Sequence, residues 1–168
     1  KAYLARGGKV LALLDPPDKP GDPAQPLLTG LLREWNIEVG NDVVLDASGI
    51  GQMLGTDASV PVAAEYPPHP ITDRFQLMTA YPYARSMQPV AGAAGGPAAQ
   101  PLMQTSGQSW AEADLASLSG GGQVAYNEDK GDRRGPITLG VAASQPATVT
   151  PPPAANATPG APDDTPKP

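Results

Sequence analysis

Apolar residues form two kinds of pattern near the start of the chain. Residues 9–14 (KVLALL) are an apolar run between glycines and prolines, which is typical of a strand buried on both faces of a sheet. Residues 27–35 (LLTGLLREW) repeat leucine and tryptophan at the spacing of one helix face. We therefore predict a buried strand at 9–14 and an amphipathic helix at 27–35. Residues 1–6 are predicted to end an earlier helix, whose own preceding strand would lie upstream of Lys1.

Shorter elements follow, separated by turn residues. Ser109, with a glutamate three positions later, matches the pattern that caps helix N-termini, so 109–115 is predicted to begin a helix. Because buried strands alternate with amphipathic helices, the predicted fold class is α/β, with a mostly parallel central sheet that has 9–14 in its interior and the 27–35 helix on one face. The other predicted elements are strands at 37–39, 42–46, 101–106 and 136–143, an edge segment at 60–66, and a short helix at 71–78.

The composition changes sharply at residue 145. The chain has 168 residues with 22 prolines and 19 glycines, and residues 145–168 hold eight of the prolines and no aromatic residue. Such a segment buries too little apolar surface to offset the entropy lost when its backbone becomes ordered. We predict one folded domain at 1–144 and a disordered linker, rich in proline, alanine and threonine, at 145–168.

Charge and cysteine content exclude several classes of function. The net charge of −6 and the lack of a clustered set of cations argue against nucleic-acid binding, since contacts to phosphates need such clusters. The absence of cysteine from the sequence excludes disulfides and a thiolate nucleophile, and it leaves the redox compartment open. No apolar run approaches the roughly 20 residues of a membrane-spanning helix.

His69 is the only histidine in the chain, and it lies between two prolines in YPPHPITDRF (66–75). Those prolines make its backbone extended and stiff. A metal site needs three or four converging ligands, and a serine hydrolase needs a nucleophile beside its base, so a single histidine supports neither chemistry. We interpret the stretch as a rigid corner with Ile71 and Phe75 buried beneath it. The sequence predicts no catalytic, cofactor-binding or metal-binding residue.

Other chemical motifs are incomplete. Residues 15–26 contain aspartates but lack the glutamate that ends a calcium loop, and the glycines of 46–55 and 120–122 lack the rest of a nucleotide-binding pattern. Loops that follow strands lie at the open end of such a sheet, so 15–26 and 106–110 form the predicted interaction surface. The candidate residues of that surface are Asp15, Asp18, His69, Ser106 and Trp110.

Five segments, taken in order, resemble one family. The family is the extracytoplasmic auxiliary domain of ABC-type transport systems, which includes the gliding-motility auxiliary proteins and is similar to the amidotransferase-like domain of intraflagellar transport proteins. The segments that carry the resemblance, all within residues 3–143, are GGKVLALLDP, LLREWNIEV, YPPHPIT, PLMQTSGQSWAEAD and GPITLGVAAS. The resemblance implies a Rossmann-like, three-layer domain on the periplasmic side of the cytoplasmic membrane. It also implies flanking membrane helices, and an ABC permease and ATPase as partners.

Two functions are compatible with these observations. The resemblance implies a non-catalytic binding or scaffolding domain of a transport complex, and not an enzyme. The alternative is a serine-dependent hydrolase or amidotransferase-like enzyme in which Ser106 or Ser109 is the nucleophile and His69 the base. Amidotransferase-like enzymes usually carry a cysteine nucleophile, which this chain lacks. No motif identifies a transported substrate, a bound ligand or an oligomeric state.

Overall fold

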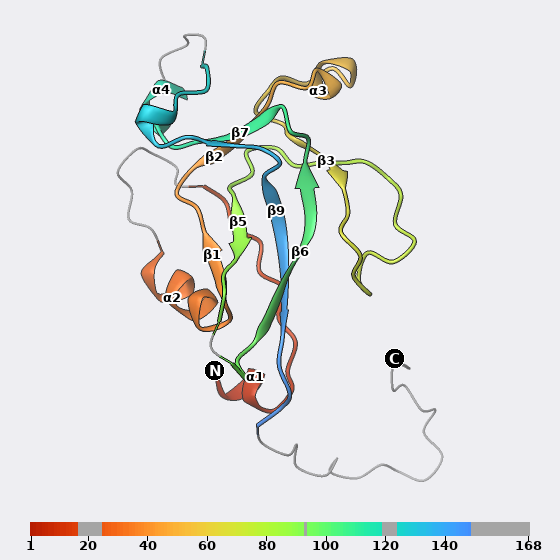
Figure 1. Cartoon of the computed structure of the whole chain (residues 1–168), viewed down its shortest axis with the longest axis vertical. Coiled ribbons are helices and arrows are strands. Elements are labelled where there is room, and N and C mark those ends of the chain that lie inside the picture. The colour runs from red at the N-terminus through yellow and green to blue at the C-terminus, as the bar shows by residue number, and fades with distance from the viewer. Residues whose placement is uncertain (17–24, 93, 119–123, 149–168) are drawn as a thin grey trace. The chain divides into compact units, whose positions relative to one another are not determined.

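The computed structural model describes residues 1–16, 25–92, 94–118 and 124–148 (Figure 1). The larger of its two units is Leu13–Gln145, and the smaller contains residues 1–12 and 146–148. The elements in chain order are α1 (Ala2–Ala5), α2 (Pro26–Glu34), β1 (Ile37–Val39), β2 (Val43–Asp46), α3 (Ile50–Met53), β3 (Val62–Glu65), β4 (Thr79–Ala80), β5 (Met87–Pro89), β6 (Ala98–Thr105), β7 (Ser109–Glu112), α4 (Leu115–Leu118), the 3-10 helix η1 (Glu128–Lys130), β8 (Arg133–Arg134) and β9 (Thr138–Ser144).

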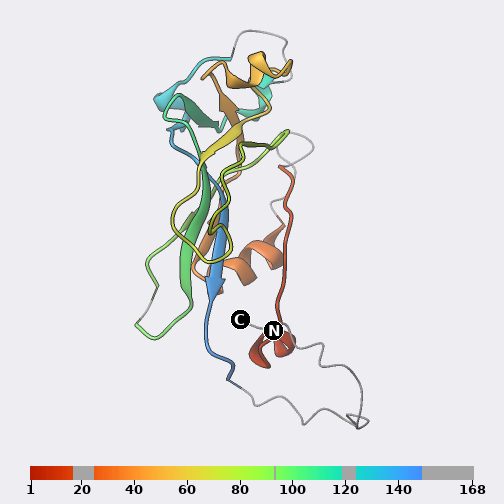
Figure 2. The same ribbon diagram turned by 90° about the vertical axis from the view of Figure 1, so that its right-hand side faces the viewer.

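The strands of the larger unit form three small sheets. β1 pairs with β5, the second sheet has the order β2-β7-β8, and the third has the order β4-β3-β6-β9. Figures 1 and 2 show β6 and β9 side by side, with Ala98 opposite Ser144 at one end and Gln104 opposite Thr138 at the other. Every strand pairing in the described residues is antiparallel. The predicted α/β class, with a mostly parallel, Rossmann-like three-layer sheet, is therefore wrong.

The run KVLALL (9–14) explains much of that error. The structure forms no strand over these residues, and Val10, Leu11 and Leu13 are 66%, 85% and 85% exposed. A continuous apolar run becomes the interior strand of a parallel sheet only where strands pair with it on both sides and helices cover its faces. None of the strand pairings among the described residues involves 9–14.

Leu13→Ala is expected to change the free energy of unfolding by less than about 0.5 kcal/mol, because an exposed side chain loses little buried area when it is shortened. Leu45→Ala is the matched control: Leu45 is only 4% exposed, and its loss is expected to cost about 2–5 kcal/mol. Urea unfolding of both variants gives the comparison. A cost of several kcal/mol for Leu13→Ala would contradict the exposed position of this run.

Strand β2 lies between two apolar clusters. Successive side chains of a strand point to opposite faces, so Val44 packs into one cluster while Val43 and Leu45 pack into the other. The first cluster contains Val44, Ala63, Ala111, Ile137 and Leu139, with Tyr66, Tyr81, Ala84 and Met103 packed against it. The second contains Val43, Leu45 and Trp110, with Leu115, Leu118, Val124 and Tyr126 packed against it. The strand with side chains in both clusters is thus β2, within DVVLD (42–46), and not KVLALL.

Several predicted elements are present in the structure. The confirmed predictions are the helix at 27–35 (α2), the strands at 37–39 (β1), 42–46 (β2) and 136–143 (β9), and the strand at 101–106, which is the second part of β6. The segment 60–66 contains β3, which lies between β4 and β6 and is not an edge strand.

The short helix α1 lies within the predicted helical segment 1–6, but the predicted helices at 109–115 and 71–78 are wrong. Residues 109–112 form β7, because Trp110 and Ala111 are both buried when this segment pairs with β2. That burial outweighs a local capping pattern. Residues 71–74 form turns, with Arg74 in the left-handed region at φ 63°, and 75–78 have no regular structure.

None of the helices in the described residues has the length and apolar character needed to span a membrane. Most of the predicted linker at 145–168 lies outside the described residues. In the described part, the Thr148 N–H donates to the Ala5 carbonyl at 3.0 Å, within the smaller unit. The predicted domain boundary at 144/145 stays a prediction.

Candidate functional site

Residues 66–78 form the loop between β3 and β4, which we name the apolar loop. Its two ends are held together because β3 and β4 pair, with Ala63 opposite Thr79. Compact surface loops whose ends meet in this way frequently carry function. Prolines at 67, 68 and 70 restrict the backbone of its first half.

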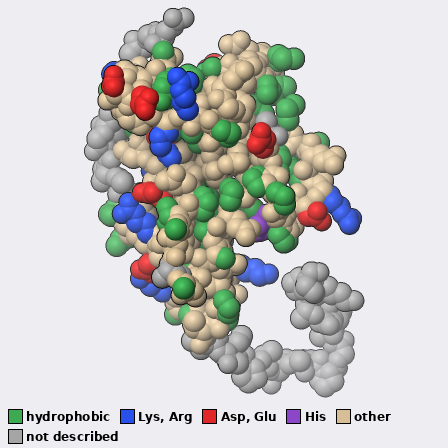
Figure 3. Space-filling model, in the orientation of Figure 1, with side chains coloured by type: hydrophobic (Ala, Val, Ile, Leu, Met, Phe, Trp, Pro, Cys, Tyr) green, Lys and Arg blue, Asp and Glu red, His purple; other side chains and the backbone are tan. Residues whose placement is uncertain are grey.

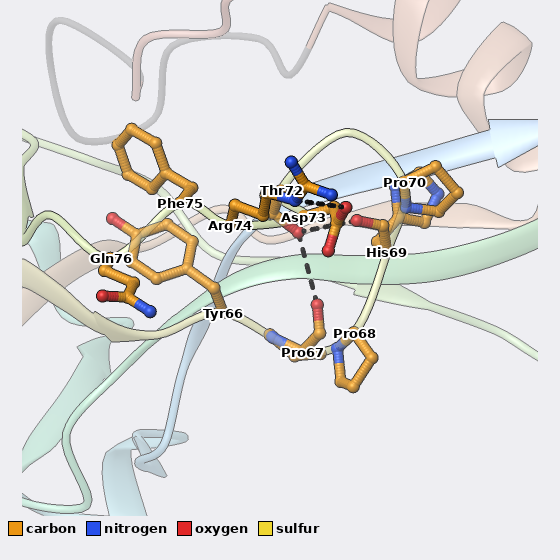
Figure 4. Close-up of a pocket in the computed structure, with 10 residues that line it drawn as sticks. All are labelled: Tyr66, Pro67, Pro68, His69, Pro70, Thr72, Asp73, Arg74, Phe75 and Gln76. Carbon is orange, nitrogen blue, oxygen red and sulfur yellow. Dashed lines mark hydrogen bonds and ion pairs between the residues drawn. The ribbon is translucent and has the colours of Figure 1, made fainter. Parts of the chain in front are cut away.

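Aromatic and hydroxyl groups fix the shape of the apolar loop. The rings of Tyr66 and Phe75 meet edge to face with centroids 5.0 Å apart. The Tyr66 hydroxyl is hydrogen-bonded at 2.5 Å to Oγ1 of Thr79, the first residue of β4. The Thr72 hydroxyl donates to the Pro67 carbonyl at 3.3 Å (Figure 4). These contacts cross the loop from one side to the other. The loop is therefore held by its own side chains, as a preformed binding loop must be.

A wide hollow of about 670 Å³ opens along residues 66–76 (Figure 4). Two of its lining residues are charged, and both are solvated: in the Arg74–Asp73 ion pair, at 3.7 Å, the side chains are 93% and 73% exposed. A solvated pair of this kind contributes little energy. The remaining lining is mostly proline and aromatic carbon, so the hollow offers contact area rather than reactive groups.

The apolar loop exposes large side chains to solvent. Ile71, Leu77 and Met78 are 68%, 69% and 61% exposed, and Phe75 is 40% exposed. Hydrophobic side chains gather beside the purple histidine in Figure 3. The interpretation that Ile71 and Phe75 are buried beneath a corner is therefore wrong. Exposed apolar patches of this kind commonly mark interaction sites.

His69 forms a local turn contact. Its Nδ1 accepts the Ile71 backbone N–H at 3.1 Å, which leaves the ring proton of the neutral form on Nε2. The two candidate nucleophiles are bonded elsewhere: the Ser106 hydroxyl donates to Asp46 Oδ1 at 3.4 Å, and the Ser109 hydroxyl donates to the Ser106 carbonyl at 2.8 Å. No hydrogen bond among the described residues joins the His69 ring to either serine. The nucleophile–base pair that the enzyme alternative requires is not formed here.

The other sequence candidates do not come together with the apolar loop. Asp15 is exposed and contributes only its backbone carbonyl, which accepts from Arg85 Nη1 at 3.1 Å. Asp18 lies outside the described residues. Trp110 is 8% exposed and belongs to the second apolar cluster, so it offers little area to a partner. Ser106 is half-buried in the turn before β7.

A second, smaller hollow of about 290 Å³ lies at the turn between β1 and β2. Its buried carboxylate is Asp42, which accepts the Ser86 N–H at 2.8 Å, the Ser86 hydroxyl at 2.7 Å and Arg133 Nη2 at 3.1 Å. A side chain at Gly40 would collide with this carboxylate and with Ser86, so only glycine fits there. The polar groups are already paired with one another, which indicates that they hold the turn.

Arg85 is buried beside the same turn, with only 4% of its surface exposed. Burial lowers the pKa of its guanidinium, and the nearby Asp42 carboxylate opposes that shift. Its Nε donates to the Gly40 carbonyl at 2.8 Å. Every buried side-chain nitrogen or oxygen in the described residues has a hydrogen-bond partner. The interior polar groups are therefore structural, and the apolar loop is the better candidate for function.

Sequence reasoning missed Leu77 and Met78 as site residues. The segment ITDRFQLM (71–78) was predicted to be a helix. In the structure it is a loop, and the loop conformation leaves its apolar side chains exposed to solvent. The available signal was the proline-rich stretch before it, because prolines at 67, 68 and 70 favour a loop over a helix.

The fold and the loop define the class of this protein: a small antiparallel β domain that presents an exposed apolar loop. Comparison with protein families is more specific. The chain belongs to the family of auxiliary domains described as "ABC-type uncharacterized transport system", whose model matches residues 1–164. This confirms the resemblance seen in the sequence at the level of the ABC transport auxiliary family. Comparison with curated proteins found no match, and comparison with solved structures found none.

Proposed function

We propose that this domain is a non-catalytic binding domain of an ABC-type transport complex, and that the apolar loop is the surface it uses. The observation that carries the proposal is the exposure of Ile71, Leu77 and Met78 on a loop that is fixed by its own side chains. A preformed apolar loop binds a protein partner without a large cost of ordering. Membership of the transport auxiliary family makes subunits of the same transport system the natural partners.

The proposed partner is the permease subunit, on the extracytoplasmic side of the membrane. The extracytoplasmic location is part of this proposal and goes beyond the family membership itself. In the proposed complex the ABC ATPase is also present, but it does not contact the apolar loop. The loop carries one cation and one anion, Arg74 and Asp73, so the contact would depend mainly on apolar area.

The double variant Leu77→Ser/Met78→Ser is expected to weaken binding to the permease about tenfold or more, because it removes two apolar side chains from the contact. The matched control is Met53→Ser/Leu54→Ser at the end of α3, where the side chains are 88% and 60% exposed. Binding to the purified permease complex of the same transport system is measured for both variants by titration calorimetry.

The control variant is expected to bind as the unsubstituted domain does. Both variants are expected to keep the thermal midpoint, since all four side chains are exposed. Unchanged binding by the Leu77/Met78 variant, or an equal loss in both variants, would contradict the assignment of the apolar loop as the specific surface.

A further inference from the structure

The strand that follows the apolar loop has an open edge. β4 is the outermost strand of the sheet ordered β4-β3-β6-β9, and it pairs on one side with β3, which Figure 1 shows on the side of β6 away from β9. Exposure alternates along residues 78–82: the side chains at 78, 80 and 82 are exposed, and those at 79 and 81 are half-buried. Such alternation is typical of an extended strand with one face toward the core. We name residues 78–82 the β4 edge.

The register between β3 and β4 shows which backbone groups of the β4 edge are unpaired. Thr79 lies opposite Ala63, and the Tyr81 N–H donates to the Pro61 carbonyl at 3.0 Å, so the backbone groups of residues 79 and 81 point toward β3. In an extended strand the N–H and C=O groups of successive residues point to opposite sides. The N–H and C=O of Ala80 therefore point away from β3, and no described strand pairs with them on that side.

The β4 edge has little of the protection that natural edge strands carry. Such strands are usually protected by charged side chains, by proline or by a covering segment. Residues 76–84 (QLMTAYPYA) contain no charged residue. Pro82 is their one proline, and it removes its own N–H but leaves the N–H of Ala80 available. The edge is therefore open to another strand at Ala80.

The two edges of the β2-β7-β8 sheet differ from the β4 edge. On the outer side of β2, the Val44 N–H donates to the Ala84 carbonyl at 2.7 Å, so this edge is already covered. β8, at the opposite edge, consists of Arg133 and Arg134. Charged side chains of this kind discourage the addition of a strand. β4 has neither a covering segment bonded to Ala80 nor a charged side chain.

We propose that a transport subunit adds an extended segment of its own chain to the β4 edge, as a further strand of this sheet. The N–H and C=O of Ala80 need a backbone partner, which a helix does not offer because its own backbone groups are bonded internally. The uncharged edge fits an uncharged segment, and the exposed Leu77 and Met78 fit apolar side chains on that segment. This inference rests on the proposed function and deepens it, because it gives the conformation in which the partner meets the apolar loop.

Ala80→Pro tests strand addition. The substitution removes the outward N–H and places a ring on the open edge, while the bond from Tyr81 to Pro61 remains. Binding to the purified permease complex, measured by titration calorimetry, is expected to weaken about tenfold or more. Ala80→Thr is the matched control, because it keeps the N–H and favours an extended backbone, and it is expected to bind as the unsubstituted domain does. Thermal midpoints of both variants show whether they are folded.

Hydrogen exchange of the unsubstituted domain provides a second test, in case Ala80→Pro does not fold. Exchange at the Ala80 amide is measured in the free domain and in the permease complex. It is expected to slow about tenfold or more in the complex, because the added strand accepts the Ala80 N–H. The reference is the Leu27 amide in the first turn of α2, where N–H groups have no partner within the helix. Its exchange is expected to stay unchanged.

The outcomes separate strand addition from the proposed function. Binding that needs Leu77 and Met78, but tolerates Ala80→Pro and leaves the Ala80 amide unprotected, would overturn strand addition alone. Slowed exchange at Ala80 together with full binding by Leu77→Ser/Met78→Ser would overturn the apolar loop as the binding surface and would support strand addition. A permease complex that does not bind the domain at all would overturn both.

A second copy of the domain is the competing occupant, because two β4 edges related by a twofold axis present the same unpaired groups to each other. Analytical ultracentrifugation of the domain alone is expected to show a monomer at the concentrations used for calorimetry. A dimer that Ala80→Pro dissociates and Ala80→Thr retains would show that the β4 edge pairs with itself. That result would overturn the assignment of a transport subunit as the partner.

Discussion

Trp110→Ala is expected to lower the free energy of unfolding by about 3–5 kcal/mol, the usual cost of removing a buried tryptophan side chain. Trp110 is 8% exposed and packs with Val43 and Leu45, and its indole N–H satisfies one oxygen of Glu112. The substitution therefore creates a cavity and also removes a donor from a buried carboxyl group. Guanidinium unfolding followed by circular dichroism measures the loss.

Trp35→Ala is the control for Trp110→Ala. Trp35 follows the last residue of α2 and is only half-buried, so a smaller loss is expected. Equal losses for the two tryptophans would mean that the second apolar cluster is not packed as described.

Asp42→Ala is expected to cost about 3 kcal/mol, because it leaves the buried Ser86 N–H and hydroxyl without their acceptor. The substitution also removes the ion pair between Asp42 and Arg133. The Arg133 side chain is 43% exposed and can be solvated, so the loss of this ion pair adds little to the change in the free energy of unfolding. Asp42→Asn keeps one acceptor oxygen and is expected to lose less. Thermal unfolding of both variants gives the order of stability.

Asp73→Ala provides the comparison for Asp42→Ala. Its carboxylate is 73% exposed and bonds only to the exposed Arg74, so its loss is expected to leave stability unchanged within about 0.5 kcal/mol. If Asp42→Ala is as mild as Asp73→Ala, the turn at Gly40 does not depend on the buried carboxylate.

The elements that could be predicted from sequence have local signals. The leucines of α2 repeat at helical spacing, and the short β2 is flanked by turn residues, so both were found at nearly the right boundaries. The family could also be recognised, because the order of segments along the chain does not depend on how they pair in space.

The sheet topology could not be predicted, because it depends on pairings between distant segments. The run 9–14 has the composition of an interior strand, but composition does not supply a pairing partner. Likewise, Ser109 and Glu112 match a helix cap, while the burial of Trp110 and Ala111 beside β2 requires a strand. A cap is worth about 1 kcal/mol, less than the burial of one tryptophan.

The candidate site was found only in part. His69 was noticed because it is unique and flanked by prolines, and the structure places it in the apolar loop. The segment 71–78 was predicted to be a short helix, and Ile71 and Phe75 were predicted to be buried beneath a rigid corner. In the structure Arg74 adopts a left-handed conformation, which is incompatible with a helix and which an arginine in the sequence does not indicate.

The pairing of β2 with β7 has a consequence for the way the chain folds. Val43 lies opposite Glu112, and the first apolar cluster also needs Ile137, just before β9, and Leu139, within β9. Long loops must close before these contacts form, and such topologies fold on the order of milliseconds to seconds. During synthesis on the ribosome, Val44 and Ala63 emerge long before Leu139, so the growing chain cannot complete the first apolar cluster until β9 has been made.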